Sequence, residues 1–78
     1  ENNTTKKLIK EGANINAVDN YGRNMLFYIR GPEDFNLVKW LDSNGINIHL
    51  HDIQGEKFPF WKQYKSYKRN LKGRGRNR

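Results

Sequence analysis

The side chains in this chain best suited to chemistry are two histidines, His49 and His51, and two aspartates, Asp19 and Asp52. The histidines stand two residues apart, so on an extended segment they point to opposite faces. No third ligand stands at a spacing typical of a metal site. We therefore expect these histidines to be structural and expect no metal centre.

The other candidates for catalysis lack the neighbours that catalysis needs. Asp19 and Asp52 each open a D-x-x-G stretch, which is typical of a turn rather than of an acid–base pair. Ser43 and Ser66 have no histidine–carboxylate context. Residues 73–76 (GRGR) are neither preceded by a strand nor followed by the Lys-Ser/Thr of a phosphate loop. There is no cysteine, so we expect neither enzyme activity nor a cofactor.

Composition limits the chain to one small domain with a thin core. It has 78 residues, of which 35% are hydrophobic, and its mean hydropathy is −1.07. No apolar run approaches membrane-spanning length, and no signal-peptide pattern is present. The lack of cysteine fits a reducing compartment. We expect an intracellular protein of the cytoplasm or nucleus, or of the host cell if it is a secreted effector.

Charge is distributed unevenly along the chain. Residues 1–61 carry seven basic and eight acidic side chains, whereas residues 62–78 carry eight basic side chains and no acidic one. The chain is therefore a nearly neutral body followed by a cationic end.

Two parts of the chain match each other at an offset of 33 residues. Residues 12–16 (GANIN) recur as 45–49 (GINIH), and residues 19–22 (DNYG) recur as 52–55 (DIQG). A period of 20 to 50 residues indicates stacked supersecondary units rather than one globular core.

Local signals place helices and arms within this repeat. Apolar spacing and turn residues predict helical segments at 3–10, 25–30, 35–43 and 58–67, the third capped by Asp34. Between them, residues 13–22 and 46–55 read as extended arms closed by tight turns. Residues 68–78 read as disordered unless a partner orders them.

This pattern resembles the ankyrin repeat, a unit of turn, short helix, short helix and extended arm. Asp19, Gly22 and Leu26 match the first half of the family pattern. The second half is matched by Leu37, Val38, Leu41, Gly45, Asn47 and Ile48. The resemblance implies an all-α solenoid of short antiparallel helix pairs with β-hairpin-like connecting arms.

The resemblance also implies a division of the chain. Residues 1–18 would be a partial repeat (second helix and arm), 19–51 a full repeat, 52–67 a degenerate or capping repeat and 68–78 a basic tail. Each repeat needs neighbours on both sides. We therefore expect the chain to be the C-terminal part of a longer array, or to be held by a partner.

Departures from the family pattern lie mainly in the first helices. The family's Thr-Pro-Leu-His becomes residues 24–27 (NMLF) and 57–60 (KFPF), so the hydrogen bonds that usually lock each turn are expected to be missing. Trp40 stands where the pattern has a solvent-facing residue. We expect it to cover the adjoining repeat; the alternative is a partner contact.

The function that the resemblance implies is a non-enzymatic scaffold for protein–protein interaction, which binds its partner through turn tips and first helices. The expected contact residues are Val18, Asn20, Tyr21, Arg23, His51, Ile53, Gln54 and Glu56. Exposed Tyr21 and Ile53 fit an interface. The alternative is that each packs against the neighbouring tip.

The cationic end supports a different function. There, aromatic side chains alternate with basic ones, a composition that suits stacking with unpaired bases and contact with phosphates. The residues of this alternative RNA-binding or ribosome-like-particle surface are Trp61, Lys62, Tyr64, Lys65, Tyr67, Lys68, Arg69, Lys72, Arg74, Arg76 and Arg78. The aromatic residues of this set, if helical, have a second alternative role, which is to cap the end of the solenoid. The charges alone also fit a solubility or nuclear-localisation role.

Overall fold

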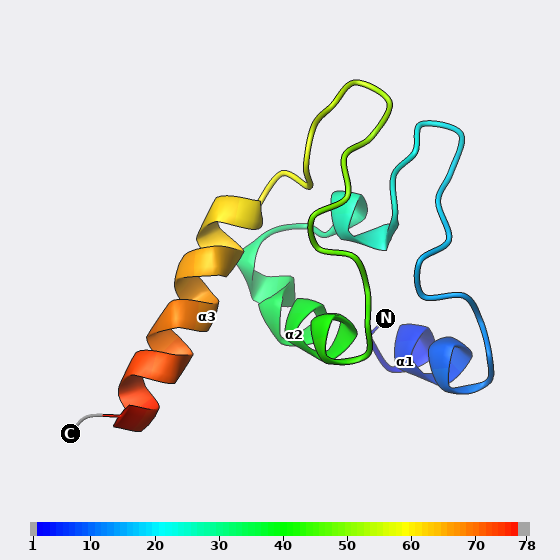
Figure 1. The fold of residues 1–78 in the computed structure, drawn as a ribbon. Helices are drawn as coiled ribbons and strands as arrows, with labels where there is room; N and C mark the ends of the chain where they lie inside the picture. The colour runs from blue at the N-terminus through cyan, green and yellow to red at the C-terminus, as the bar shows by residue number, and fades with distance from the viewer. Residues whose placement is uncertain (1, 77–78) are drawn as a thin grey trace.

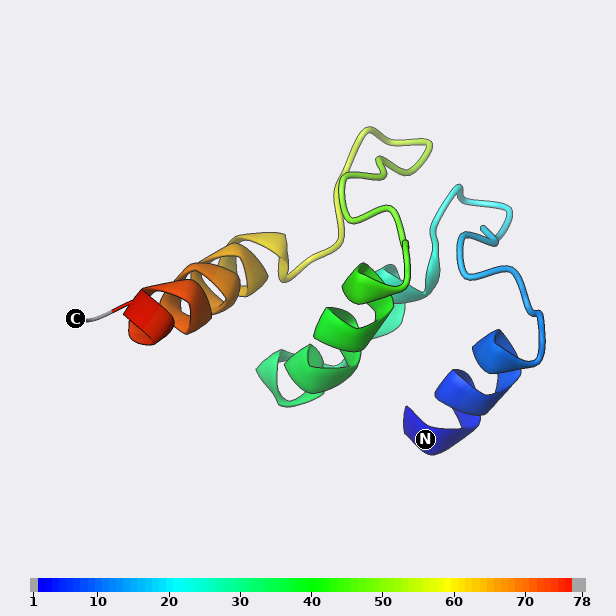
Figure 2. The same cartoon turned by 60° about the horizontal axis from the view of Figure 1, so that its bottom comes forward.

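Three α-helices lie in a row in the computed structural model, which describes residues 2–76, and two long arms project on one side of that row (Figures 1 and 2). The helices are α1 (Asn2–Lys10), α2 (Phe35–Ser43) and α3 (Trp61–Arg76). Two single turns of 3₁₀-helix, η1 (Met25–Tyr28) and η2 (Pro32–Asp34), connect the first arm to α2. The molecule is a plate of 45 × 31 × 19 Å.

The first two helices end in the same way, 33 residues apart. After α1, Gly12 has φ 107°, and the N–H groups of Gly12 and Ala13 donate to the carbonyls of Ile9 and Leu8. After α2, Gly45 has φ 96°, and the N–H groups of Gly45 and Ile46 donate to the carbonyls of Asp42 and Leu41. Both ends are Schellman motifs, which need a residue in the left-handed region and therefore favour glycine.

The arms are loops, not hairpins. No strand occurs within residues 2–76, so the prediction that the arms are β-hairpin-like is wrong. In the first arm, the backbone hydrogen bonds near the tip are Asp19 N–H to Arg23 O and Gly22 N–H to Asp19 O. These two bonds close a turn but do not extend into a ladder between the two legs.

The helical segment after the first arm is shorter than predicted. We expected a helix over residues 25–30, but η1 ends at Tyr28 because Ile29 is extended. The next N–H, that of Arg30, donates to the Asp34 carboxylate at 3.0 Å instead of to the preceding turn. The prediction that Asp34 caps α2 is therefore wrong. Asp34 stands at the N-cap position, but its side chain makes no capping hydrogen bond.

The core lies around α2, which has the bounds that the sequence predicts. Its Phe35, Val38 and Leu41 are buried together with Leu26 of η1. The second arm and α3 complete the core with three further buried side chains, those of Ile46, Phe58 and Tyr64. On the α1 side, Lys6 lies 5.6 Å from the ring of Trp40. Trp40 therefore contacts the adjoining unit, as expected.

α3 differs from the sequence prediction at both ends. It begins at Trp61 rather than at residue 58, because Pro59 disfavours helical geometry at the residue before it. It continues to Arg76, so residues 68–76 are helical where we expected disorder. Residues 62–72 contain no proline, glycine or β-branched residue, and Lys, Arg and Leu favour helix. Residues 77 and 78 lie outside the described part of the chain.

The helical class predicted from the sequence is confirmed. None of the helices in residues 2–76 has the length and apolar character needed to cross a membrane.

Candidate functional site

The tip of each arm is built around one aspartate. Oδ1 of Asp19 accepts hydrogen bonds from the N–H groups of Tyr21 at 2.9 Å and Arg23 at 3.1 Å. Oδ1 of Asp52 accepts from Gln54 and Glu56, both at 2.9 Å. The predicted turn-forming role of both aspartates is therefore confirmed.

These hydrogen bonds hold the tip carboxyls in the ionised form. Bonds from the backbone N–H of Glu56 and from the Arg23 side chain keep the pKa of Asp52 below its usual value, although burial opposes them. The Tyr28 hydroxyl and the tip N–H groups lower the pKa of Asp19 in the same way. Both groups already serve as acceptors of several hydrogen bonds, so neither is placed as a general base or acid.

The two tips are attached to each other. Nε of Arg23 donates to Oδ2 of Asp52 at 3.1 Å, and the Ile53 N–H donates to the Tyr21 carbonyl at 2.9 Å. A Cβ at Gly22 would lie 3.3 Å from both the Ile53 backbone nitrogen and its Cγ2, so the arms approach too closely there for a larger residue. Together the contacts fix one tip against the other.

Large apolar side chains remain exposed on these paired tips. Val18, Tyr21 and Ile53 are 53%, 57% and 72% exposed. The other predicted contact residues on the tips are also exposed, namely Asn20, His51, Gln54 and Glu56. Arg23 differs because it is partly buried in the pairing with Asp52. The structure thus brings the predicted set together on two neighbouring loops (Figure 1), and we call this surface the paired tips.

The histidines stand apart from any ligand cluster. His49 and His51 are both exposed, and the His49 N–H donates to Oδ1 of Asn47. Asn14 and Asn16 make the same local bond in the first arm. Within residues 2–76, no group of three histidine or carboxylate side chains is placed to hold a metal ion.

Asn24 has a role that sequence reasoning missed. It is 1% exposed. Its Oδ1 caps the Leu26 N–H of η1, and its Nδ2 donates to the Asn47 carbonyl of the second arm, both at 3.1 Å. Asn24 therefore locks the turn, where we expected that lock to be missing. The signal in the sequence was asparagine at the helix-capping position.

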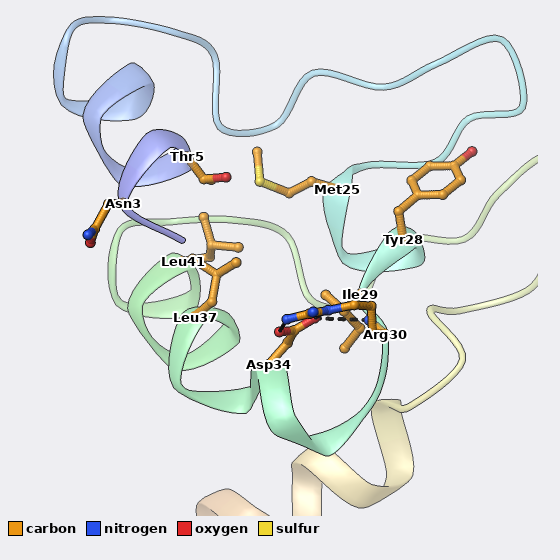
Figure 3. A pocket seen from close by; sticks show the side chains of 9 residues that line it. All are labelled: Asn3, Thr5, Met25, Tyr28, Ile29, Arg30, Asp34, Leu37 and Leu41. Carbon is orange, nitrogen blue, oxygen red and sulfur yellow. Dashed lines mark hydrogen bonds and ion pairs between the residues drawn. The ribbon is translucent and has the colours of Figure 1, made fainter. Parts of the chain in front are cut away.

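A hollow of about 550 Å³ lies between α1 and the segment that runs from η1 to α2 (Figure 3). Its wall carries one ion pair, in which Nη2 of Arg30 lies 2.8 Å from Oδ1 of Asp34. This pairing lowers the pKa of Asp34 to about 2. The remaining lining residues are apolar or uncharged: Asn3, Thr5, Met25, Tyr28, Ile29, Leu37 and Leu41. The hollow offers no nucleophile beside a base, so we regard it as a seam between two units.

The body-facing side of α3 is used for packing. Tyr64 is 2% exposed, and its ring lies edge-on to Phe35 at 5.5 Å. The Tyr64 hydroxyl and the Lys68 ammonium both donate to Oδ2 of Asp42 at 2.9 Å. Tyr67 stacks on Tyr64, and its hydroxyl donates to Asn36. These residues cap the end of the helical row, which was the second alternative for them.

Burial and the Asp42 carboxylate raise the pKa of Tyr64 far above its usual value. Burial opposes ionisation of Asp42, but hydrogen bonds from Lys68 and Tyr64 lower its pKa. The Asp42 carboxylate is therefore ionised and satisfied at the junction of α2 and α3.

A neighbouring side of α3, which shares Tyr64 and Lys68 with the packed side, forms a groove with the second arm. This groove, of about 360 Å³, is lined by apolar and cationic side chains, and we call it the basic groove. It is lined by Ile48, His49, Lys57, Phe58, Trp61, Tyr64, Lys65, Lys68 and Arg69. Lys57, which was not among the residues predicted for this surface, lies 4.1 Å from the Trp61 ring.

Part of the alternative nucleic-acid set is not placed by the structure. The side chains of Lys72, Arg74 and Arg76 lie outside the described part of the chain, as does Arg78 entirely. Lys62 is exposed near the same tryptophan, 5.6 Å from its ring.

No protein-family model, curated protein or solved structure matches this chain. Within the chain itself, residues that match at the 33-residue offset make matching hydrogen bonds.

Proposed function

We propose that this chain is a non-enzymatic binding module, built of stacked ankyrin-type units, that docks a partner protein on the paired tips. The observation that carries the proposal is the attachment of one tip to the other. Arg23 and Asp52 join the arms through their side chains, and Tyr21 and Ile53 join them through their backbones.

Repetition of the unit supports the ankyrin-type architecture. The Schellman helix ends, the aspartate turns and the short asparagine bonds at 14–16 and 47–49 all recur at the 33-residue offset. The units are also joined along the arms, where Asn16 accepts from the Asn47 N–H and donates to the Gly45 carbonyl. Regular stacking of this kind gives a solenoid with its loops on one side.

Exposure and preorganisation support a protein as the ligand. Tyr21 and Ile53 offer apolar anchors, and exposed polar side chains surround them, which is the composition of a protein-binding patch. Because the tips are already fixed to each other, little conformational entropy remains to be lost on docking. A flexible pair of loops would lose more.

Site-specific photo-crosslinking tests this proposal. A benzophenone amino acid is placed at Tyr21 or Ile53 in the full chain expressed in source cells, and at Lys39, exposed on α2, as the control. We expect one defined protein adduct from both tip positions and none from the control position. The same adducts from all three positions, or none from the tips, would overturn the proposal.

The adduct identifies a partner whose affinity is then measured with purified components. We expect Tyr21→Ala and Ile53→Ala each to weaken binding about tenfold or more, which corresponds to ~1.4 kcal/mol. Thermal melting of each variant checks that the tip is intact. Unchanged affinity in both variants would show that the paired tips are not the contact surface.

A further inference from the structure

The basic groove concentrates positive charge that the protein does not neutralise. The ammonium groups of Lys57, Lys62 and Lys65 lie 4.1, 5.6 and 5.8 Å from the Trp61 ring. Within residues 2–76, none of the three forms an ion pair with a carboxylate, and residues 57–78 contain no acidic side chain. No carboxylate is among the residues that line the groove, and Asp42, which bonds to the lining residues Lys68 and Tyr64, already accepts from both.

The start of α3 adds to this field. Its first turn carries no acidic residue that would offset the positive end of the helix. Trp61, Lys65 and Arg69 follow one another at four-residue intervals, so they form a stripe along one face of the helix. A polyanion that follows this face meets a cation at each turn.

The side chains of α3 differ in what they bond to, although Tyr64 and Lys68 also line the groove. Tyr64, Tyr67 and Lys68 are engaged with α2, and their polar atoms have partners there. Trp61 and Lys65 bond to nothing on α2. The Trp61 ring packs in part against the core, but it is only partly buried, and it also lines the groove, where three lysine ammonium groups surround it.

The exposed part of the Trp61 indole favours a nucleic acid over an acidic peptide as the ligand of the groove. An acidic peptide would neutralise the lysines but would offer nothing flat to stack on Trp61. A nucleotide carries both groups, a phosphate for the cations and a base for the ring. Lys57 now covers the indole at 4.1 Å. Its flexible side chain can turn from the ring to a phosphate, and that movement opens the ring face to a base.

We propose that the basic groove binds single-stranded nucleic acid, with a base stacked on Trp61 and the adjacent phosphates on Lys57, Lys65 and Arg69. This site is separate from the paired tips, since the two surfaces share no residue. Failure of either proposal leaves the other standing.

Matched charge removal tests the placement of the phosphates. The full chain is titrated with a fluorescent oligouridine of about 12 nucleotides, long enough to cover a single-strand site. The groove variant is Lys57→Gln with Lys65→Gln. The control is Lys7→Gln with Lys39→Gln, which removes the same charge from exposed positions on α1 and α2.

We expect the groove variant to bind about tenfold or more weakly at physiological salt, and the control to bind within about threefold of the unaltered chain. The slope of log affinity against log salt should become shallower by about 1.4 in the groove variant, because two phosphate contacts are lost. Equal losses in both variants would show that only net charge matters and would overturn the proposal. Unaltered binding in the groove variant would do so too.

Two indole resonances in one sample test the stacking. The N–H signals of Trp61 and Trp40 are followed by NMR during the same titration, and Trp40, on α2, serves as the internal control. We expect the Trp61 signal to move and the Trp40 signal to stay. A stationary Trp61 signal at saturation would overturn the stacked arrangement.

A polyglutamate peptide of similar length and charge tests the competing occupant. We expect it to bind at least about tenfold more weakly than oligouridine, because it cannot use the indole. Equal affinity for the two polyanions would overturn the proposal that the basic groove recognises nucleic acid.

Discussion

The guanidinium of Arg23 lies 3.1 Å from the carboxylate of Asp52, across the gap between the two arms. The ion pair joins two copies of the same turn, and each copy is also stabilised by its own aspartate. Every aspartate of the chain is held in the ionised form by hydrogen bonds or an ion pair. Protonation must therefore weaken the tips and the body together.

Acid should destabilise the protein for this reason. The pKa of Asp34 is lowered to about 2, and those of Asp19, Asp42 and Asp52 are also lowered. A group whose folded pKa is depressed stabilises the fold above its unfolded pKa, here about 3.9, and loses that effect as the pH falls through the folded pKa. We expect the melting temperature to be level from neutral pH to about pH 5 and to fall steadily from about pH 4 to pH 2.

The Asp34→Asn variant provides the control for that measurement. Asparagine does not titrate, so the variant should start from a lower melting temperature and lose less of it in acid than the unaltered chain. A melting temperature that is as high at about pH 2 as at neutral pH would contradict this account of the aspartates.

Substitution of the buried Asn24 should destabilise the fold far more than substitution of the exposed Asn70. Asn24→Ala removes a buried cap of η1 and leaves the Leu26 N–H and the Asn47 carbonyl without partners. We expect a loss of about 1–3 kcal/mol in the free energy of unfolding, measured by urea denaturation. Asn24→Thr keeps an oxygen for the Leu26 N–H and should recover part of the loss. Asn70→Ala, exposed on α3, should be nearly neutral, and equal effects at both positions would contradict the role of Asn24.

The repeat provides a matched pair of leucines. Leu41 and Leu8 occupy the same position of the unit, but Leu41 is 0% exposed and Leu8 is 53% exposed. Leu41→Ala should therefore cost about 2–5 kcal/mol, whereas Leu8→Ala should cost less than about 1 kcal/mol. Amide hydrogen exchange should likewise be faster in α1 than in α2. Similar costs for the two leucines would mean that α1 is covered as fully as α2 in solution.

The helix ends and the turns at the arm tips could be predicted from the sequence, because they depend on neighbouring residues alone. The glycine after α1 and after α2, and the D-x-x-G turn at each tip, act within a few residues of themselves, so the sequence pattern is sufficient to place them. The bounds of α2 were predicted for the same reason. The contact of Trp40 with the α1 side was also predicted, from its position in the repeat.

The remaining features depend on distant partners, which no local pattern reveals. Asn24 is buried because the second arm brings the Asn47 carbonyl to it. Tyr64 could be assigned to a nucleic-acid surface or to a cap from the sequence, and only its contact with Asp42 across 22 residues decides between them. The 3₁₀ turn η1 is short because Asp34 takes the N–H of Arg30. Lys57 joins the basic groove only because the arm returns to α3.

The helical state of the C-terminal residues can be tested with two glycines. α3 includes Gly73 and Gly75, where the sequence favoured disorder. In a helix interior, glycine costs about 1 kcal/mol relative to alanine. If 68–76 are helical in solution, Gly73→Ala and Gly75→Ala should each increase the circular-dichroism signal of helix and slow amide exchange through the last turns of α3. Gly12→Ala serves as a control with the opposite expected sign. Gly12 has a positive φ, so the same substitution should destabilise the protein there. Rapid amide exchange throughout 68–76, unaltered in both α3 variants, would show that this end is disordered and that α3 ends near Tyr67.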